Sequence, residues 1–225
     1  MRPKAHLFDP WWRILYGTAK IIPLHSTSIC LETRINTGFL GDCRLLQYGG
    51  PDGEIGASMR YLSQRFTMSD RRVAGLLTDI GTEELAHLEM VSTIIHQLTK
   101  GLSMEEIENS NLGPYYIDHT VAVWPQAAGG IPFNACEFQS KGDPITDLHE
   151  DMAAEQKARS TYDNILRVVR NIPEVADPIR FLRAREVVHF QRFGEALRMI
   201  QEDLDSNNFY AFNPAFDSPT KCNCK

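Results

Sequence analysis

The chain has 225 residues, of which 43% are hydrophobic and 23% are charged, and its formal net charge is −6. This composition is that of an ordinary globular protein, and it excludes the collagenous, low-complexity and disordered classes. The acidic balance leaves no basic stripe, so we expect no nucleic-acid partner. The sequence contains no apolar run long enough to cross a membrane, so we expect a soluble protein with no membrane association.

The five cysteines are odd in number and scattered, unlike the pattern of a secreted disulfide framework. The first residues do not have the pattern of a signal peptide. We therefore expect a reducing, cytoplasmic location. Cys222 and Cys224 could bind a metal or cross-link chains, but an exposed, frayed terminus is the simpler interpretation.

The N-terminal part of the chain divides at a cluster of turn-forming residues. Residues 1–44 show no persistent helical or strand period, so we expect an irregular N-terminal arm. The Gly-Gly-Pro-Asp-Gly run at 49–53 marks a turn, and a helix is expected after it, over 54–66. A longer helix is expected over 69–100, because polar residues can cap its start and Gly101 follows its end.

The C-terminal half predicts a long connection and two more helices. Ser103 and Glu106 form a capping-box motif for a short helix. Residues 113–142 are rich in Gly, Pro and aromatic residues and predict a long crossover. Helices are expected over 143–170 and 177–204, since each segment opens with an Asp-Pro pair.

These elements add up to four main helices in two pairs, joined by one long connection. This arrangement predicts an all-α protein with a ferritin-like four-helix bundle. We expect the bundle to occupy residues 45–205, between the irregular arm at 1–44 and an irregular tail at 206–225.

Two Glu-x-x-His motifs lie in the second and fourth predicted helices. Residues three apart share a helix face, so Glu84 points the same way as His87, and Glu186 the same way as His189. Their neighbours one turn away are all apolar: Ile80, Val91, Leu182 and Phe193. We therefore expect the four side chains to face the core, where a carboxylate needs a partner.

Each of the other two helices supplies a matching acid. Glu54 lies 30 residues before Glu84, and Glu155 lies 31 residues before Glu186, which makes a twofold repeat. Four inward carboxylates and two imidazoles are the ligand set of a dinuclear, carboxylate-bridged site in a ferritin-like bundle. Carboxylate and imidazole ligands favour manganese or iron over thiophilic metals. For one motif alone, a solvated ion pair would be the better interpretation.

Other charged residues near the motifs fall on neighbouring helix faces and are expected to be solvated: Glu83, Glu89, Glu150 and Asp151. His96 and His149 have no acid at the matching spacing, so we expect them to be surface or satisfied core residues.

Five segments of the chain resemble the manganese catalases. They are Gly-Gly-Pro-Asp-Gly-Glu at 49–54, Asp-Ile-Gly-Thr-Glu-Glu-Leu-Ala-His-Leu-Glu at 79–89, Gly-Asp-Pro-Ile at 142–145, Ala-Glu-Gln-Lys-Ala-Arg at 154–159 and Phe-Leu-Arg-Ala-Arg-Glu-Val-Val-His at 181–189. A resemblance to the short, spore-coat (CotJC-type) branch is carried by the tail, Asn-Phe-Tyr-Ala-Phe-Asn-Pro-Ala-Phe-Asp at 208–217. The resemblance covers about residues 45–217, whereas residues 1–44 do not resemble the family's N-terminal segment.

The resemblance implies two manganese ions per chain and a set of ligands for them. Glu54 and His87 would bind one ion, and Glu155 and His189 the other. Glu84 would bridge the pair.

The resemblance also implies roles for two residues that do not bind metal. Glu186 would be a catalytic, proton-handling carboxylate beside the cluster and not a ligand. Tyr61 lies seven residues after Glu54, on the same helix face, and matches a phenol that orients that ligand.

The function expected from the resemblance is that of a dimanganese catalase, which disproportionates hydrogen peroxide to water and dioxygen. We expect a cytoplasmic homo-oligomer, with deposition in the spore coat and contact with other coat proteins as further expectations. Two alternatives remain open. One is a di-iron oxidase or ferroxidase of the rubrerythrin kind, which uses the same ligand types, and the other is a structural spore-coat protein with an incidental metal site.

Overall fold

The computed structural model describes residues 47–99, 102–109, 127, 131–138 and 140–205. Its helices are α4 (Glu54–Gln64), α5 (Arg71–Thr99), α6 (Met104–Glu108), α8 (Pro144–Val169) and α9 (Pro173–Asp205), with one short 3-10 helix, η2 (Ala135–Phe138). The arm expected at 1–44, the tail with its two cysteines and most of the expected crossover lie outside the described residues. None of the described helices is long and apolar enough to span a bilayer.

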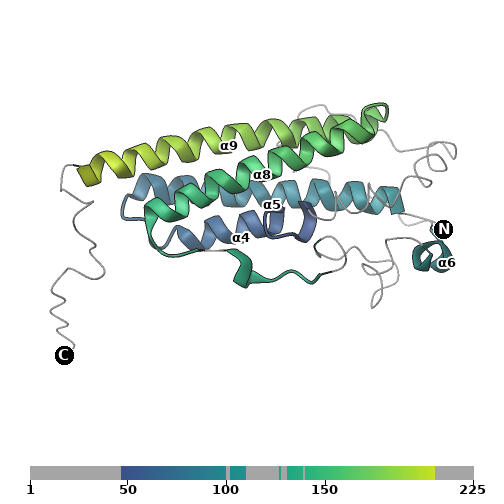
Figure 1. The fold of residues 1–225 in the computed structure, drawn as a ribbon, viewed down its shortest axis with the longest axis horizontal. Coiled ribbons are helices and arrows are strands. Elements are labelled where there is room, and N and C mark those ends of the chain that lie inside the picture. The colour runs from purple at the N-terminus through teal and green to yellow at the C-terminus, as the bar shows by residue number, and fades with distance from the viewer. Residues whose placement is uncertain (1–46, 100–101, 110–126, 128–130, 139, 206–225) are drawn as a thin grey trace, which may run out of the picture.

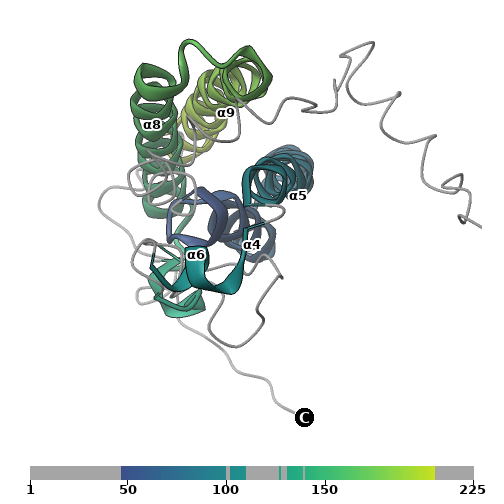
Figure 2. The ribbon, with the colours of Figure 1, turned by 90° about the vertical axis from the view of Figure 1, so that its right-hand side faces the viewer.

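The four long helices lie side by side as a bundle (Figure 1). α4 packs mainly against α5, and α8 mainly against α9, so the bundle consists of two helical hairpins (Figure 2). The predicted all-α, ferritin-like four-helix bundle is therefore confirmed.

A tight turn sets the start of α4. The Gly53 N–H donates to the Gly50 carbonyl at 3.0 Å. A Cβ at Gly56 would lie 2.6 Å from the carbonyl oxygen of Pro51, so only glycine allows the first turn of α4 to pack this closely. This turn places Glu54 at the first position of the helix, with its side chain buried.

The predicted capping residues are confirmed at three helix starts. A carboxylate oxygen of Asp70 accepts a hydrogen bond from a backbone N–H in the first turn of α5 at 2.7 Å. Asp143 accepts from the Thr146 N–H ahead of α8, and Pro144 occupies the first helical position. Ser103 and Glu106 form both bonds of a capping box. These bonds satisfy backbone donors that the first turn leaves unpaired.

The predicted start of α9 at Asp177-Pro178 is wrong. The helix begins one turn earlier, at Pro173, and the Ile172 carbonyl accepts the first two helical hydrogen bonds, at 3.1 and 2.8 Å. The turn before Pro178 is held by apolar burial of Val175, Ala176 and Ile179. Because a proline near a helix start removes only one backbone donor, this burial outweighs the break that the Asp-Pro pair suggested.

Two apolar clusters fill the bundle, one toward each end. On α5, the first cluster contains residues 73–80 and the second residues 90–95. On α9, the first cluster contains residues 193–200 and the second residues 175–182. Residues 83–87 of α5 and 186–189 of α9 therefore fall between the clusters. Glu84, His87, Glu186 and His189 are buried between these clusters, whereas Glu83 is partly exposed.

Candidate metal centre

Six side chains of the predicted metal site meet between the two apolar clusters. They come from all four long helices: Glu54 from α4, Glu84 and His87 from α5, Glu155 from α8, and Glu186 and His189 from α9. Each of them is at most 2% exposed. The predicted inward orientation is therefore confirmed, and so is the burial of the apolar neighbours one turn away.

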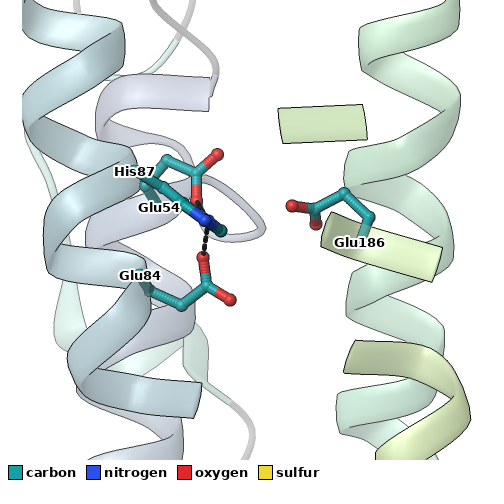
Figure 3. A group of neighbouring side chains, drawn as sticks. All are labelled: Glu54, Glu84, His87 and Glu186. Atoms are coloured by element: carbon teal, nitrogen blue, oxygen red, sulfur yellow. Dashed lines mark hydrogen bonds and ion pairs between the residues drawn. The ribbon is translucent and has the colours of Figure 1, made fainter. Parts of the chain in front are cut away.

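The donors form two groups, and Glu84 belongs to both. The first contains Glu54, Glu84, His87 and Glu186, and the second contains Glu84, Glu155 and His189. Within each group, one ligand atom from every residue lies within 4.8 Å of the others. Glu186 belongs to the first group only, and in Figure 3 it points from α9 across the bundle toward the other three.

Glu84 lies between the two imidazoles. Its Oε2 is 2.7 Å from Nδ1 of His87, and its Oε1 is 2.7 Å from Nδ1 of His189. The two rings are nearly parallel, with centroids 5.6 Å apart and an interplanar angle of 20°. One oxygen of Glu84 thus faces one nitrogen of each imidazole, and Glu84 is shared by the two donor groups.

Several of these buried atoms lack an aligned hydrogen-bond partner among the described residues. They are Glu84 Oε1, His87 Nε2, Glu155 Oε2, Glu186 Oε1, and both ring nitrogens of His189. Buried polar atoms are normally hydrogen-bonded, so a cluster of buried ligand atoms without aligned hydrogen bonds fits a metal-binding site. Oxygen and imidazole ligands without a thiolate suit manganese or iron. The side chains therefore fit a dinuclear metal site.

Two buried tyrosines bind the outer carboxylates in a crossed pattern. The Tyr61 hydroxyl donates to Glu155 Oε1 at 2.5 Å, so the expectation that Tyr61 orients Glu54 is wrong. Tyr162 makes the bond to Glu54 instead. Each tyrosine lies seven residues after one of these glutamates and binds the other, because α4 and α8 face each other across the site. Sequence reasoning missed Tyr162, although its spacing from Glu155 repeats that of Tyr61 from Glu54.

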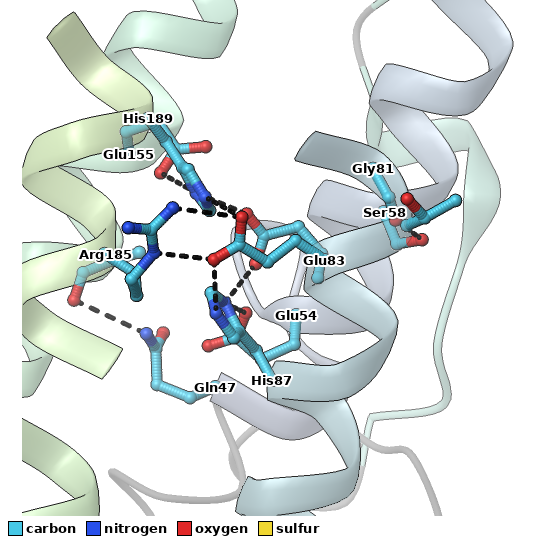
Figure 4. A network of polar contacts seen from close by, with 12 residues as sticks. Gln47, Glu54, Ser58, Gly81, Glu83, His87, Glu155, Arg185 and His189 are labelled. Atoms are coloured by element: carbon cyan, nitrogen blue, oxygen red, sulfur yellow. Dashed lines mark hydrogen bonds and ion pairs between the residues drawn. The ribbon is translucent and has the colours of Figure 1, made fainter. Parts of the chain in front are cut away.

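Glu83 is not the freely solvated residue that the sequence suggested. Its carboxylate lies 3.4 Å from His87 Nε2 and 3.2 Å from His189 Nε2. Arg185 donates to the same carboxylate, from Nε at 2.6 Å and from Nη2 at 3.1 Å. Figure 4 shows Glu83 between the arginine and the two rings. The sequence signal was its position four residues before His87, which is also a shared helix face.

Comparison with known proteins agrees with this geometry. The family described as "Manganese containing catalase" matches residues 42–213. The chain belongs to the manganese catalase family.

Two relatives and one solved structure show the extent of the similarity. The chain is 49% identical over 164 residues to Protein CotJC of Bacillus subtilis (strain 168), covering 73% of this chain and 86% of that protein. It is 34% identical over 172 residues to a "Probable manganese catalase" of Clostridium acetobutylicum, covering 72% of each. The crystal structure of KatB, a manganese catalase from Anabaena, matches with a TM-score of 0.65 and 28% identity, covering 72% of each chain.

The manganese catalase family uses a dimanganese centre, and the two donor groups of this chain fit it. In the metal-free protein, burial raises the pKa of every carboxyl group in the site and so favours the neutral form. For Glu84 alone among the four glutamates of the two donor groups, the two imidazoles outweigh burial and hold the pKa well below the ordinary value. Burial lowers the pKa of both histidines, but the charge of Glu84 outweighs it. The pKa of His189 is raised to about 11, and that of His87 is also raised.

The other carboxyl groups of the manganese catalase centre keep their protons more readily. Burial raises the pKa of Glu54 to about 8, with the His87 imidazole opposing the rise and the charge of Glu84 adding to it. The pKa of Glu186 is raised well above the ordinary value, first by burial and then by Glu155 and the other nearby carboxylates. These effects favour the protonated form of Glu186 in the metal-free site.

Asp151 was also expected in solvent, and it is fully buried. It lies on α8 one turn before Glu155 and one turn after Asp147, and all three are buried. The four-residue spacing of these acids was the signal that they share the inward face. Glu150 is half-buried, whereas the other residues expected at the surface are exposed: Glu89, His96 and His149.

Proposed function

We propose that this chain is a dimanganese catalase that disproportionates hydrogen peroxide to water and dioxygen. The observation that carries the proposal is Glu84, which places one oxygen 2.7 Å from each of two imidazoles. Membership of the manganese catalase family supports the proposal, as does the name of the Clostridium relative.

In this proposal the two donor groups divide the ligands between two manganese ions. Glu54 and His87 hold one ion, Glu155 and His189 hold the other, and Glu84 bridges them. When bound, the manganese pair supplies the two-electron change that peroxide disproportionation requires. The surrounding apolar clusters keep bulk water out of the site.

Glu186 is proposed as the acid–base residue. It belongs to only one of the two donor groups, so it does not take the bridging position that Glu84 has. In the metal-free site, burial and neighbouring carboxylates raise the pKa of its carboxyl group well above the ordinary value, which favours the protonated form. A carboxyl group placed in this way can deliver a proton to an oxygen of peroxide and take it back.

A second candidate function is a di-iron oxidase of the rubrerythrin kind. The observation that favours it is the distance of Glu186 from Glu54, Glu84 and His87, which is short enough for Glu186 to be a ligand. In that case the metal of the isolated protein would be iron, and Glu186 would bind it directly.

The variant Glu186→Gln distinguishes the two functions. Glutamine keeps the size of the side chain but removes the proton, so we expect two bound manganese ions and an oxygen-evolution rate lower by a factor of about 10²–10⁴. Glu195→Gln makes the same change at an exposed position of α9 and should leave both quantities unaltered. Metal content and oxygen evolution are measured on the same preparations. Loss of one metal ion in Glu186→Gln would contradict the acid–base role and favour the oxidase.

We further propose a cytoplasmic homo-oligomer that is deposited in the spore coat beside other coat proteins. The tail motif at 208–217 and the 49% identity to Protein CotJC support this location. Immunogold labelling of sporulating cells tests the location, and light scattering of the purified protein tests the oligomer. A coat protein that binds two manganese ions but evolves no oxygen from peroxide would show a structural role with an incidental metal site.

A further inference from the structure

Glu83 and Glu84 are consecutive residues that approach opposite nitrogens of the same two rings. Glu84 lies 2.7 Å from Nδ1 of both His87 and His189. The oxygens of Glu83 are divided between the other nitrogens, with Oε1 3.4 Å from Nε2 of His87 and Oε2 3.2 Å from Nε2 of His189 (Figure 4). Each of these two carboxylates therefore contacts both imidazoles.

The two ring nitrogens of a metal-binding histidine have different tasks. The nitrogen that binds the metal needs a free lone pair, and the other nitrogen then carries the proton. Nδ1 of each ring faces Glu84, so a bound metal would take the lone pair of Nδ1, and Nε2 would then carry the proton in both rings. Glu83 is an acceptor within reach of both Nε2 atoms.

Arg185 fixes the carboxylate of Glu83. Its guanidinium donates to both oxygens, at 2.6 and 3.1 Å, and such a two-pronged pair fixes the orientation of the carboxylate. The pair also connects α5 to α9, and each of these helices carries one of the histidines. Glu83 and Arg185 are each 28% exposed, so this contact lies on the side of the centre that is nearest to solvent.

We propose that Glu83 is a shared positioning residue that holds both histidines as Nδ1 ligands, with Arg185 fixing its orientation. The proposal rests on the dimanganese centre proposed above. Its consequence is that the two metal sites depend on one carboxylate outside the ligand set. Removing that carboxylate should weaken both sites together, whereas loss of Glu54 or Glu155 should weaken one.

If the Glu83–Arg185 ion pair only stabilised the packing of the hairpins, its loss would not act on the histidines. A second ion pair between the same two helices serves as the control. Arg192 of α9 pairs with Asp79 of α5 at 2.7 Å, so this pair also connects the two hairpins. Asp79 lies one turn before Glu83 and forms no described contact with either histidine. If Glu83 only ties the hairpins together, Glu83→Gln and Asp79→Asn should both act on the free energy of unfolding, the exposed Asp79 pair less, and neither should change the affinity of the Mn²⁺ sites.

The experiment compares Mn²⁺ binding to metal-free Glu83→Gln, Asp79→Asn and the unsubstituted chain by titration calorimetry. The electron paramagnetic resonance spectrum of each loaded protein is recorded as a measure of the coupled pair. We expect Glu83→Gln to weaken both Mn²⁺ sites by about 10–100-fold and to alter the spectrum, as loss of a carboxylate behind a metal-binding histidine does. Asp79→Asn should change neither quantity.

The proposal is overturned if Glu83→Gln binds two Mn²⁺ ions with unchanged affinity, if it weakens one site only, or if Asp79→Asn produces an equal loss. Should Glu83→Gln fail to fold, Arg185→Gln takes its place. Weakening of both sites in Arg185→Gln supports the proposal, and unchanged binding overturns it. Because affinity is measured without turnover, failure of the catalase proposal would show separately, as two bound ions without oxygen evolution.

Discussion

At the scale of single residues, the crossed tyrosine–glutamate pairs connect α4 to α8 through buried atoms. Tyr61 donates to Glu155, and Tyr162 binds Glu54, so neither tyrosine serves the glutamate on its own helix. Both tyrosines are fully buried. A buried hydrogen bond to a carboxylate is worth more than an ordinary one, and losing it leaves the other partner unsatisfied.

A double-mutant cycle in the metal-free protein tests this crossed pairing. Tyr61→Phe combined with Glu155→Gln should show a coupling of about 0.5–3 kcal/mol in the free energy of unfolding, because the two residues are in contact. Tyr61→Phe combined with Glu54→Gln should show a smaller coupling, because the Tyr61 hydroxyl bonds Glu155 and forms no described hydrogen bond with Glu54. Urea unfolding gives the four free energies of each cycle. A larger coupling with Glu54 than with Glu155 would show that each tyrosine serves its own helix.

These residues also show how far the sequence predicts the site. The spacing of Glu84 and His87 fixes a shared helix face, and the apolar neighbours show that this face is inward, so the donors were predictable. The partner of Tyr61 was not, because helical spacing says which way a side chain points but not which helix it meets. Glu83 was misjudged for a related reason, since its partner Arg185 lies on another helix.

At the scale of elements, the close approach of α4 and α5 depends on one glycine. A Cβ at Gly81 would lie 2.9 Å from Cγ of Leu62 and 3.4 Å from its backbone nitrogen. The buried Ser58 hydroxyl donates to the Gly81 carbonyl at 2.7 Å, which confirms how near the helices are. Gly81 lies one turn before Glu84, so this contact also sets how deeply the Glu84 carboxylate lies between the helices.

Two glycine substitutions on α5 should therefore have opposite signs. Gly81→Ala pushes the two helices apart and should lower the free energy of unfolding by about 1–3 kcal/mol, as overpacking does. Gly75→Ala meets no atom within 4 Å and removes backbone freedom from the unfolded chain, so it should raise the free energy by up to about 1 kcal/mol. Urea unfolding of both metal-free variants measures the difference. Stabilisation by Gly81→Ala would mean that the helices are not in close contact there.

The elements themselves were largely predictable, and α9 shows where prediction stopped. Caps such as Asp143 and Ser103 act on their own helix, so the sequence next to them is sufficient. The start of α9 depends on the burial of Val175 against residues of other helices. Local sequence favoured the Asp-Pro pair at 177–178, and tertiary packing decided the outcome.

At the scale of the whole molecule, the centre joins two hairpins that pack mainly within themselves. The hairpin of α4 and α5 supplies Glu54, Glu84 and His87, and the hairpin of α8 and α9 supplies Glu155, Glu186 and His189. A metal pair bridged by Glu84 would therefore hold the hairpins together. Because such ions bind the folded chain and not the unfolded one, they add to its stability by mass action.

The free energy of unfolding of the metal-free protein should depend on pH, and the pKa shifts of the site residues determine whether it rises or falls. The pKa of Glu54 is raised from 4.5 to about 8, so the folded chain holds this proton more tightly than the unfolded chain. The stabilisation from this proton is complete below pH 4.5 and is lost as the pH rises through about 8. The pKa of His189 is raised from 6.5 to about 11, so its contribution is lost between these values. The metal-free protein should therefore become less stable as the pH rises from about 5 to 8.

Manganese binding should have the opposite dependence, because the ligands bind as deprotonated groups. Each proton that manganese displaces makes the affinity rise about tenfold per pH unit, so the manganese-induced increase in Tm should be larger at about pH 8 than at about pH 5.5. Calorimetric Tm values with and without saturating Mn²⁺ measure the increase. Glu84→Ala is the control, since loss of the bridge should abolish most of the increase at both pH values. An increase that is the same at both pH values in the unsubstituted chain would show that Glu54 and His189 do not hold protons in the metal-free site.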